Sequence, residues 1–257
     1  AVSVVMRFAS LGSGSKGNAT LVEAGDACLL LDCGFSAREL ERRLATLQLD
    51  GTRLSGILVT HEHGDHIKGV WTLARRHKLP VYMTGGTAKV GAAPSDIDLH
   101  LITPQQRFQV GGVDVLPVAV PHDAREPVQF VFNYAGLKLG VLTDLGHISS
   151  HVLECYQGCD GLLVEANHDP VMLADGPYPY SLKQRVGGDW GHLNNEQAAG
   201  LLKALEPRSL QALVVGHISQ QNNALGVVQE VMAPVAQVVP QIIYASQDDC
   251  VDWLALE

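Results

Sequence analysis

Thr60-His61-Glu62-His63-Gly64-Asp65-His66 is the stretch of this sequence that decides its fold and its chemistry. It follows a short apolar run, and residues 56–60 are predicted to form a strand whose carboxyl end carries the cluster. Sites of layered α/β folds form at such strand ends. His61 and His63 are two residues apart in extended chain and are expected to point toward one ion. Gly64 is expected to permit a sharp turn, since glycine has no Cβ, and Asp65 and His66 then face a second position.

The ligand types in this cluster indicate which metals it would hold. Imidazole and carboxylate groups together suit Zn²⁺, Mn²⁺ or Fe²⁺, and the absence of cysteine from the cluster argues against a purely structural zinc site. Three histidines and an aspartate within six residues, on a glycine-containing turn after an apolar strand, are poorly explained as chance surface residues. The sequence therefore predicts two divalent metal ions and a hydrolytic site.

Composition limits the classes of protein to consider. A chain of 257 residues with 46% hydrophobic and 18% charged residues is typical of a globular protein. The net charge of −9 excludes a general nucleic-acid coat, because such proteins are usually basic, but not a local cationic groove around bound ions. No apolar run approaches the roughly 18 residues of a membrane span. Oligomeric state stays open.

The ends and the cysteines of the chain bear on its location. The first residues lack the layout of a signal peptide, and Met6 is a candidate start residue, which would make residues 1–5 an addition or the product of an upstream start. Five scattered cysteines form no disulfide framework, so we expect a reducing cytoplasm.

Alternating strand and helix patterns run along the whole chain. Strands are predicted over residues 2–8, 19–32 (a hairpin broken at Gly25-Asp26), 56–60, 81–83, 113–120, 129–134, 138–143, 161–165, 212–215, 241–244 and 251–254. Helices are predicted over residues 36–47 (with Ser36 as N-cap), 70–77, 195–205 and 223–232. Strand-rich halves that are each closed by helices favour an αββα four-layer sandwich, with two mixed sheets facing each other and helices outside. No linker divides the chain, so residues 1–257 are expected to form a single metallo-hydrolase domain.

The histidine cluster resembles the HxHxDH signature of the metallo-β-lactamase fold superfamily. Within that superfamily the chain is similar to the YycJ (VicX/WalJ-like) group of bacterial exonuclease-like proteins, from about Met6 to the C-terminus. The stretches that carry this likeness are residues 11–18 (LGSGSKGN), 165–169 (EANHD), 191–195 (GHLNN) and 216–223 (GHISQQNN).

The resemblance implies a complete set of ligands for two divalent ions, Zn²⁺ or Mn²⁺ or else Fe²⁺. The first ion would be held by His61, His63, His122 and Asp144, and the second by Asp65, His66, Asp144 and His217. Asp32 matches the first motif of the superfamily and is expected to organise the site without binding metal. Two such ions would share a bridging hydroxide that attacks the substrate.

Further residues select the substrate. Glu165 and His192 resemble a glutamate–histidine pair of tRNase Z-type members, in which the histidine meets the scissile phosphate; a purely structural pair is the alternative. Together with Asp65 they are the expected catalytic residues. Substrate phosphates are expected to meet side chains near His192 and on the glycine-rich loop after the first strand, whose backbone N–H groups are also expected to serve as donors. These residues are Lys183, Arg185, Ser15, Lys16 and Asn18.

A metal-dependent hydrolase of phosphodiester bonds is thus the leading hypothesis. The resemblance further implies that the substrate is a nucleic acid, DNA rather than RNA, and that cleavage is of the exonuclease type. One alternative is a phosphodiesterase that acts on small molecules or cyclic nucleotides, which the acidic pI favours. A thioesterase or lactamase is a weaker alternative, since no apolar substrate loop is evident. The alternative without enzyme activity is a metal-stabilised partner in a regulatory or repair complex.

Overall fold

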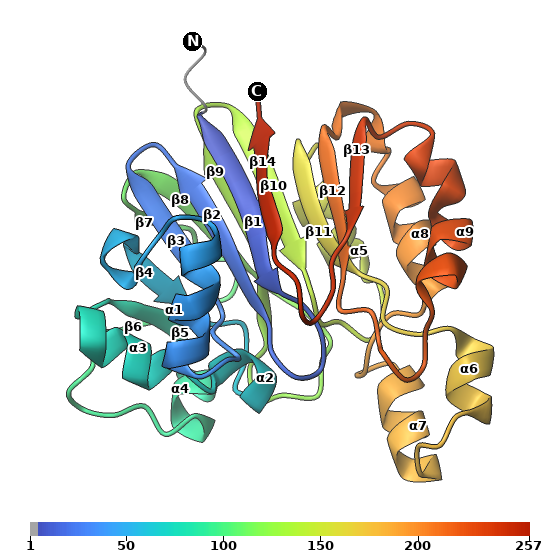
Figure 1. The fold of residues 1–257 in the computed structure, drawn as a ribbon, viewed down its shortest axis with the longest axis horizontal. Helices are drawn as coiled ribbons and strands as arrows, with labels where there is room; N and C mark the ends of the chain where they lie inside the picture. Colours follow the sequence, from blue (N-terminus) through green and yellow to red (C-terminus); the bar gives the residue numbers. More distant parts are fainter. Residues whose placement is uncertain (1–4) are drawn as a thin grey trace.

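The computed structural model describes residues 5–257, so part of the strand expected over residues 2–8 lies outside the described residues. The described residues form two seven-stranded sheets (Figure 1). The first sheet contains β1 (Met6–Gly12), β2 (Ala19–Ala24), β3 (Ala27–Leu31), β4 (Gly56–Leu58), β5 (Val81–Thr84), β6 (Leu99–Ile102) and β14 (Val251–Leu256). The second contains β7 (Phe108–Val110), β8 (Val113–Ala119), β9 (Val128–Tyr134), β10 (Leu137–Leu142), β11 (Gly161–Glu165), β12 (Ala212–Gly216) and β13 (Gln241–Tyr244).

Each sheet has an antiparallel half and a parallel half. In the order β14-β1-β2-β3-β4-β5-β6, pairing is antiparallel up to β3 and parallel from there. In the order β7-β8-β9-β10-β11-β12-β13, pairing is antiparallel up to β10 and parallel from there. Mixed sheets were predicted from the alternating elements, and the prediction is confirmed.

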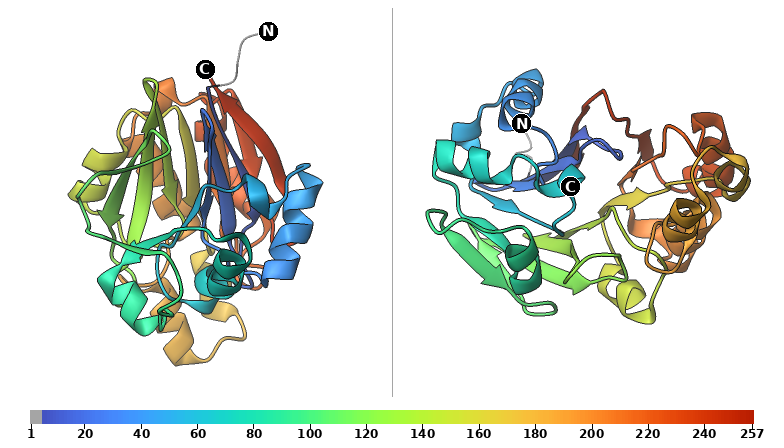
Figure 2. Two further views of the ribbon diagram at one scale, coloured as in Figure 1. Left: turned by 90° about the vertical axis from the view of Figure 1, so that its left-hand side faces the viewer. Right: turned by 90° about the horizontal axis from the view of Figure 1, so that it is seen from below.

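Helices cover the outer faces of both sheets (Figure 2). On the side of the first sheet lie α1 (Ala37–Thr46), α2 (Gly64–Ile67), α3 (Val70–His77) and α4 (Gly85–Val90). On the side of the second lie α5 (Ser150–Tyr156), α8 (Asn195–Ala204) and α9 (Leu225–Ala236), and α6 (Pro170–Asp175) and α7 (Tyr180–Gly187) project beyond the strand ends (Figure 1). Short 3-10 turns span Gly51–Arg53 and Pro207–Ser209.

Three apolar clusters of the described residues lie between these layers. The central one lies between the sheets and joins residues of both, such as Phe8 and Leu29 with Phe130 and Val141. A second packs the other face of the first sheet against α1 and α3, and a third packs the second sheet against α5, α8 and α9. Burial of this apolar surface is the main force that holds the four layers together. The predicted αββα sandwich is confirmed.

Local sequence signals explain several element boundaries. Gly25 has a φ of 57° in the turn between β2 and β3, where glycine meets no steric penalty. Ser36 caps α1, since its hydroxyl oxygen accepts the backbone N–H of Glu39 at 3.1 Å. Both features were predicted.

Several elements were not predicted from the sequence: β6, β7, α2, α4, α5, α6 and α7. The edge strand β6 exposes His100 and Leu101, so it lacks the apolar alternation of a half-buried strand. Helix α7 buries none of its residues, which removes the apolar periodicity of an amphipathic helix. Among the described helices, none combines the length and apolar character needed to cross a membrane.

Candidate metal centre

The expected ligands follow strand ends from both sheets. His61 comes after β4, His122 after β8, Asp144 after β10 and His217 directly after β12. These strands bring their carboxyl ends to one edge of the sandwich, so residues far apart in sequence meet there. All seven predicted ligands belong to groups whose ligand atoms lie within 4.8 Å of one another.

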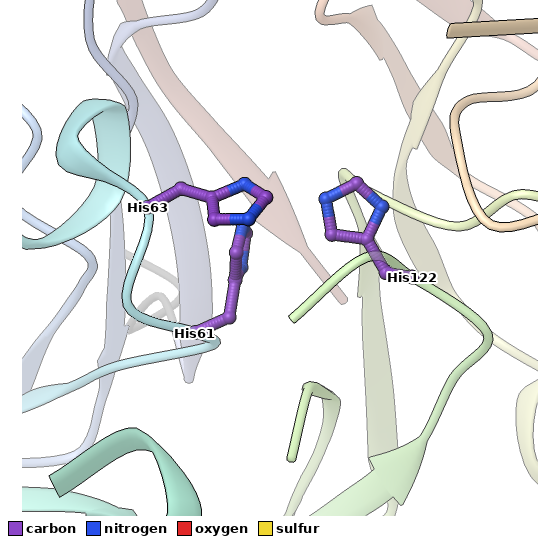
Figure 3. A group of neighbouring side chains, drawn as sticks. All are labelled: His61, His63 and His122. Atoms are coloured by element: carbon purple, nitrogen blue, oxygen red, sulfur yellow. The ribbon is translucent and has the colours of Figure 1, made fainter. Parts of the chain in front are cut away.

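The first group consists of His61, His63 and His122 (Figure 3). The ring centroids lie 4.5 Å apart for His61 and His63, 4.9 Å for His61 and His122, and 5.1 Å for His63 and His122. Figure 3 shows that the first two rings come from the loop after β4 and the third from the opposite sheet. The three imidazoles therefore converge on one space.

Asp144 lies between this group and the second one. Its Oδ2 is 3.1 Å from His66 Nε2, and its Oδ1 is 3.4 Å from His217 Nε2 and 3.7 Å from His122 Nε2. Asp65 Oδ2 completes the second group, 3.3 Å from His66 Nε2 and 3.7 Å from His217 Nε2. A carboxylate in contact with both groups has the position of a bridging ligand.

Neighbouring groups orient the imidazoles. Thr60 donates its hydroxyl to Asp32 Oδ2 at 2.8 Å, so it must accept the N–H of His61 Nδ1, which lies 2.8 Å away. His122 Nδ1 donates to the carbonyl of Gly191 at 2.8 Å, and His63 Nε2 donates to that of Asp123 at 2.6 Å. In each case the other ring nitrogen keeps its lone pair, as a metal ligand requires.

Unpaired atoms test whether this set fits divalent cations. Among the described residues, seven buried side-chain nitrogen and oxygen atoms lack a hydrogen-bond partner. Four of the seven belong to the predicted ligands, namely His61 Nε2, His122 Nε2, His217 Nε2 and Asp144 Oδ2. Such atoms are costly to bury without a partner, and imidazole nitrogens with carboxylates are ligands of Zn²⁺, Mn²⁺ and Fe²⁺. The set fits divalent metal binding.

The electrostatics of the cluster favour positive charge. Burial lowers the pKa of His122 to about 4 and that of His61 well below its usual value, so both rings are neutral. Burial alone would raise the pKa of Asp144, but the charges of His66 and His217 lower it well below its usual value. Burial also opposes the protonation of His217, yet Asp144 raises its pKa to about 9. The carboxylate of Asp144 thus stabilises positive charge on the neighbouring groups.

Glu165 and His192 meet beside the ligands. His192 Nδ1 lies 2.8 Å from Glu165 Oε2, and the backbone N–H groups of Leu145 and Leu193 donate to Glu165 Oε1, each at 3.0 Å. Burial raises the pKa of Glu165 well above its usual value and lowers that of His192 to about 4. The His192 ring is 5.2 Å from that of His122 and 4.9 Å from that of His217. The predicted pair therefore borders both ligand groups.

The predicted substrate-binding residues divide into two sets. A cavity of about 380 Å³ beside the ligands is lined by Ser15 and Arg185 together with His192. Lys183 faces away from it, because its ammonium group donates to the carbonyl of Ala174 at 2.6 Å and borders a separate cavity. Asn18 is buried, and its amide donates to Asp65 Oδ2 at 3.2 Å, so it contacts a ligand and not the open cavity.

The glycine-rich loop lacks the expected row of free backbone donors. The N–H groups of Gly14 and Lys16 donate to the side chains of Asn18 and Gln247, at 3.0 and 2.8 Å. Those of Ser13, Gly17 and Asn18 donate to backbone carbonyls. The expectation was wrong because these donors are already paired, within the loop or with distant segments of the chain. The side chains of Ser15 and Lys16 are exposed.

Gly64 also differs from its predicted role. It is the first residue of α2, has no left-handed φ, and a Cβ built there meets nothing within 4 Å. The close approach lies instead at Gly34, where a Cβ would stand 1.7 Å from the carbonyl oxygen of Asp65. The turn is made without any need for glycine at position 64.

Other residues that line the cavity were not singled out from the sequence. They are Asn167, Tyr178, Trp190, Ser219 and Asn222, among others. Asn167, Ser219 and Asn222 fall in or next to stretches that carry the family likeness, which was a usable signal. Tyr178 and Trp190 belong to the segment around α7, and no periodicity indicates which way their rings face.

Comparison with known proteins agrees with this geometry. The family model of the beta-lactamase superfamily domain matches residues 28–218. The chain is 35% identical to exodeoxyribonuclease YycJ of Bacillus anthracis, across 85% of this chain and 84% of the relative. It is 34% identical to exodeoxyribonuclease WalJ of Streptococcus pneumoniae, across 84% and 83%.

Solved structures show the same fold at low sequence identity. The metallo-beta-lactamase fold protein YhfI of Bacillus subtilis superposes with a TM-score of 0.74 at 17% identity, covering 96% of this chain and 99% of that one. The short form of human tRNase Z superposes with a TM-score of 0.66 at 18% identity, covering 96% and 98%. The chain therefore belongs to the beta-lactamase superfamily and, within it, to the family of the YycJ and WalJ exodeoxyribonucleases.

Proposed function

We propose that this protein is a metal-dependent exodeoxyribonuclease that hydrolyses phosphodiester bonds of DNA with two divalent ions, zinc or manganese. The observation that carries the proposal is that three residues with unpaired ligand atoms, His122, Asp144 and His217, line one cavity together with His192, which Glu165 holds from behind. The names of both relatives, which are exodeoxyribonucleases, support DNA as the substrate. The proposed ligands are His61, His63, Asp65, His66, His122, Asp144 and His217.

Ions held there would supply Lewis acidity and an activated water near neutral pH. The chain's own residues do the rest. Glu165 holds Nδ1 of His192, which leaves Nε2–H for the scissile phosphate. When Nε2 gives its proton to the leaving oxygen, the buried carboxyl group of Glu165, whose pKa is raised, gives its proton to Nδ1, so that the ring stays neutral. Asn18 holds the carboxylate of Asp65, a proposed catalytic residue, in place.

Contacts with the DNA backbone complete the proposal. Ser15 and Arg185 line the cavity and are proposed to bind substrate phosphates, together with the exposed Lys16 on the same loop. Arg185 contacts Asp123 Oδ2 at 2.7 Å, so phosphate binding by its guanidinium competes with that carboxylate. Lys183 has no part in this arrangement, because its ammonium group is engaged elsewhere.

Two wider expectations accompany the activity. We infer that the whole chain acts as one domain, because the central apolar cluster draws residues from the first strand to the last. We also infer a reducing compartment, the cytoplasm, in which the five cysteines stay free as they are in the structure.

A panel of 5′- and 3′-labelled single- and double-stranded DNA and RNA, assayed with Zn²⁺, Mn²⁺ and Fe²⁺ in turn, tests the proposal. We expect stepwise shortening of DNA, which Asp65→Ala abolishes. The matched control is Arg75→Ala, which removes an exposed ion pair with Asp96 that borders no part of the cavity. DNA cleavage that survives Asp65→Ala would overturn the proposal.

Small phosphodiesters form a second arm of the same assay. A cavity of about 380 Å³ lies within the size range of small-ligand sites. Turnover of cyclic nucleotides without cleavage of any DNA would replace the nuclease with the alternative phosphodiesterase. If metal-loaded protein cleaves neither class, the protein is a metal-stabilised binding partner and the enzyme assignment is wrong.

A further inference from the structure

Trp190 is a large aromatic side chain exposed at the rim of the metal-site cavity. Its side chain is 62% exposed, yet the residue lines the same cavity as His192, two positions later. A single exposed hydrophobic side chain is ordinary on a protein surface. This one lines the cavity of the candidate site, where an aromatic side chain with a polar N–H can meet a ligand.

The backbone of Trp190 is held firmly on both sides. Its carbonyl accepts the N–H of Asp123 at 2.9 Å, and the next carbonyl, that of Gly191, accepts Nδ1 of His122 at 2.8 Å. A Cβ on Gly146 would stand 2.1 Å from the carbonyl oxygen of Asp189 and 2.5 Å from the nitrogen of Trp190, so the two segments pack backbone to backbone. The main chain at Trp190 is thus tied to a metal ligand.

The indole itself is not tied down in the same way. Within residues 5–257, the ring that packs against it is His147, edge-on at 86° with centroids 6.3 Å apart. A T-shaped neighbour can cover at most one of the two indole faces, and the residue is largely exposed. A fixed backbone with an open aromatic face is a preorganised surface for stacking.

The indole of Trp190 offers no charge to a phosphate. Asp123 follows the proposed ligand His122, and its carboxylate contacts Arg185 Nε at 2.7 Å, so this acid and this base largely neutralise each other until a phosphate takes the guanidinium. Phosphates would be drawn to ions at the metal centre and to Arg185, whereas a neutral, flat group suits the indole. Tyr178 adds a second aromatic side chain to the lining.

We propose that Trp190 stacks on the base of the nucleotide next to the scissile phosphodiester, so that the enzyme takes its substrate as an unpaired terminal nucleotide. This inference rests on the proposed nuclease function and specifies its substrate. Bases inside a duplex offer only their edges, and a base face becomes accessible when the nucleotide is unstacked. Stacking also supplies affinity that the net charge of −9 denies to nonspecific phosphate attraction.

Steady-state kinetics on paired single strands test this. One labelled strand carries ordinary terminal nucleotides, and its partner carries abasic tetrahydrofuran residues at both ends. For the wild-type protein we expect a KM about 10-fold lower on the strand with bases, the fold-change that base stacking on an aromatic side chain provides. Trp190→Ala should raise KM for that strand alone and remove the difference, with kcat changed less than about twofold. Trp190→Phe should retain most of the difference.

A binding readout separates stacking from general damage. Indole fluorescence of the wild-type protein should fall when a noncleavable phosphorothioate strand binds, and Trp190→Ala should lose this quenching. Trp253→Phe is the matched control, because Trp253 packs under Arg7 and lines no part of the cavity. Metal content and thermal unfolding of each variant confirm that the fold persists.

The outcomes distinguish the two proposals. If the wild-type protein cleaves no DNA, the nuclease function fails and this inference fails with it. If it cleaves both strands with equal KM, or if Trp190→Ala raises KM equally on both, the stacking role of Trp190 is wrong while the nuclease function stands. Full-rate digestion of a duplex whose ends are covalently crosslinked would likewise overturn the requirement for an unpaired end.

Discussion

His66 Nδ1 donates to Asp32 Oδ2 across 2.6 Å, in a contact where both side chains are buried. Asp32 also accepts the backbone N–H and the hydroxyl of Thr60, each at 2.8 Å. It stands in a left-handed conformation, with a φ of 63°, between β3 and the metal cluster. Asp32 thus orients a proposed ligand and belongs to none of the groups with ligand spacing among the described residues.

The first prediction concerns this support. Asp32→Asn keeps the shape of the side chain but removes the charge that orients His66. We expect metal affinity to fall by about 10–100-fold, the usual effect of losing a group that hydrogen-bonds a metal ligand. Metal titration followed by calorimetry measures this affinity. Asp96→Asn, in an exposed ion pair with Arg75, is the control. Unchanged affinity in Asp32→Asn would contradict the supporting role.

The second prediction separates catalysis from metal binding at His192. His192→Ala should lower kcat by about 10²–10⁴-fold, the range for loss of a general acid, while the metal content stays at the wild-type value. The two quantities are measured by single-turnover assay and elemental analysis. Because His192 also groups with His122 and Asp144 at ligand spacing, loss of an ion in this variant would show that it is a ligand instead.

Much of the metal centre could be predicted from the sequence because its ligands are tied to strand ends. Apolar runs that predict strands precede His61, Asp144 and His217 in the sequence. Each of these strands ends at the same edge of the sandwich, where the proposed ligand follows it. Helices α1, α3, α8 and α9 were predictable for a similar reason, as in α1, where Leu40 and Leu44 recur on one face. When one face of an element is buried, its apolar residues recur at regular intervals, and this periodicity can be recognised in the sequence.

The features that were missed or wrong depend on contacts between distant segments. The glycine-rich loop turns its donors inward because Gln247, more than two hundred residues later, accepts from Lys16. The backbone of Trp190 is positioned by its close approach to Gly146, which lies 44 positions earlier in the sequence. Lys183 and Arg185 lie on one helix, but they face different cavities. No local pattern encodes such pairings.

The third prediction concerns acid stability near α1. Glu39 contacts Arg42 at 2.6 Å and Arg43 at 2.9 Å, and hydrogen bonds from these guanidinium groups lower its pKa from 4.5 to about 2. A carboxylate with a lowered folded-state pKa stabilises the protein fully above pH 4.5, and this stabilisation is lost as the pH falls from 4.5 toward 2. Urea unfolding of wild type and Glu39→Gln should therefore differ at pH 6 and converge near pH 2. A difference that persists at pH 2 would contradict this assignment.

The last prediction compares two glycines beside the metal ligands. Gly34→Ala would place a Cβ 1.7 Å from the carbonyl oxygen of Asp65 and 2.8 Å from the nitrogen of Asn18, and backbone cannot move aside as a flexible side chain can. We expect a loss of stability of about 2 kcal/mol or more from this strain, together with weaker metal binding, because Asp65 must shift.

Gly64→Ala is the matched variant at the residue just before Asp65. A Cβ there meets nothing within 4 Å and the residue has no left-handed φ, so alanine stabilises the protein by about 0.4–1 kcal/mol through the lower entropy of the unfolded chain. We expect unchanged or slightly higher stability and full metal content, measured by urea unfolding and elemental analysis side by side with Gly34→Ala. Equal damage from both substitutions would mean that neither position tolerates a Cβ. The close contact at Gly34 would then not be what holds Asp65 in place.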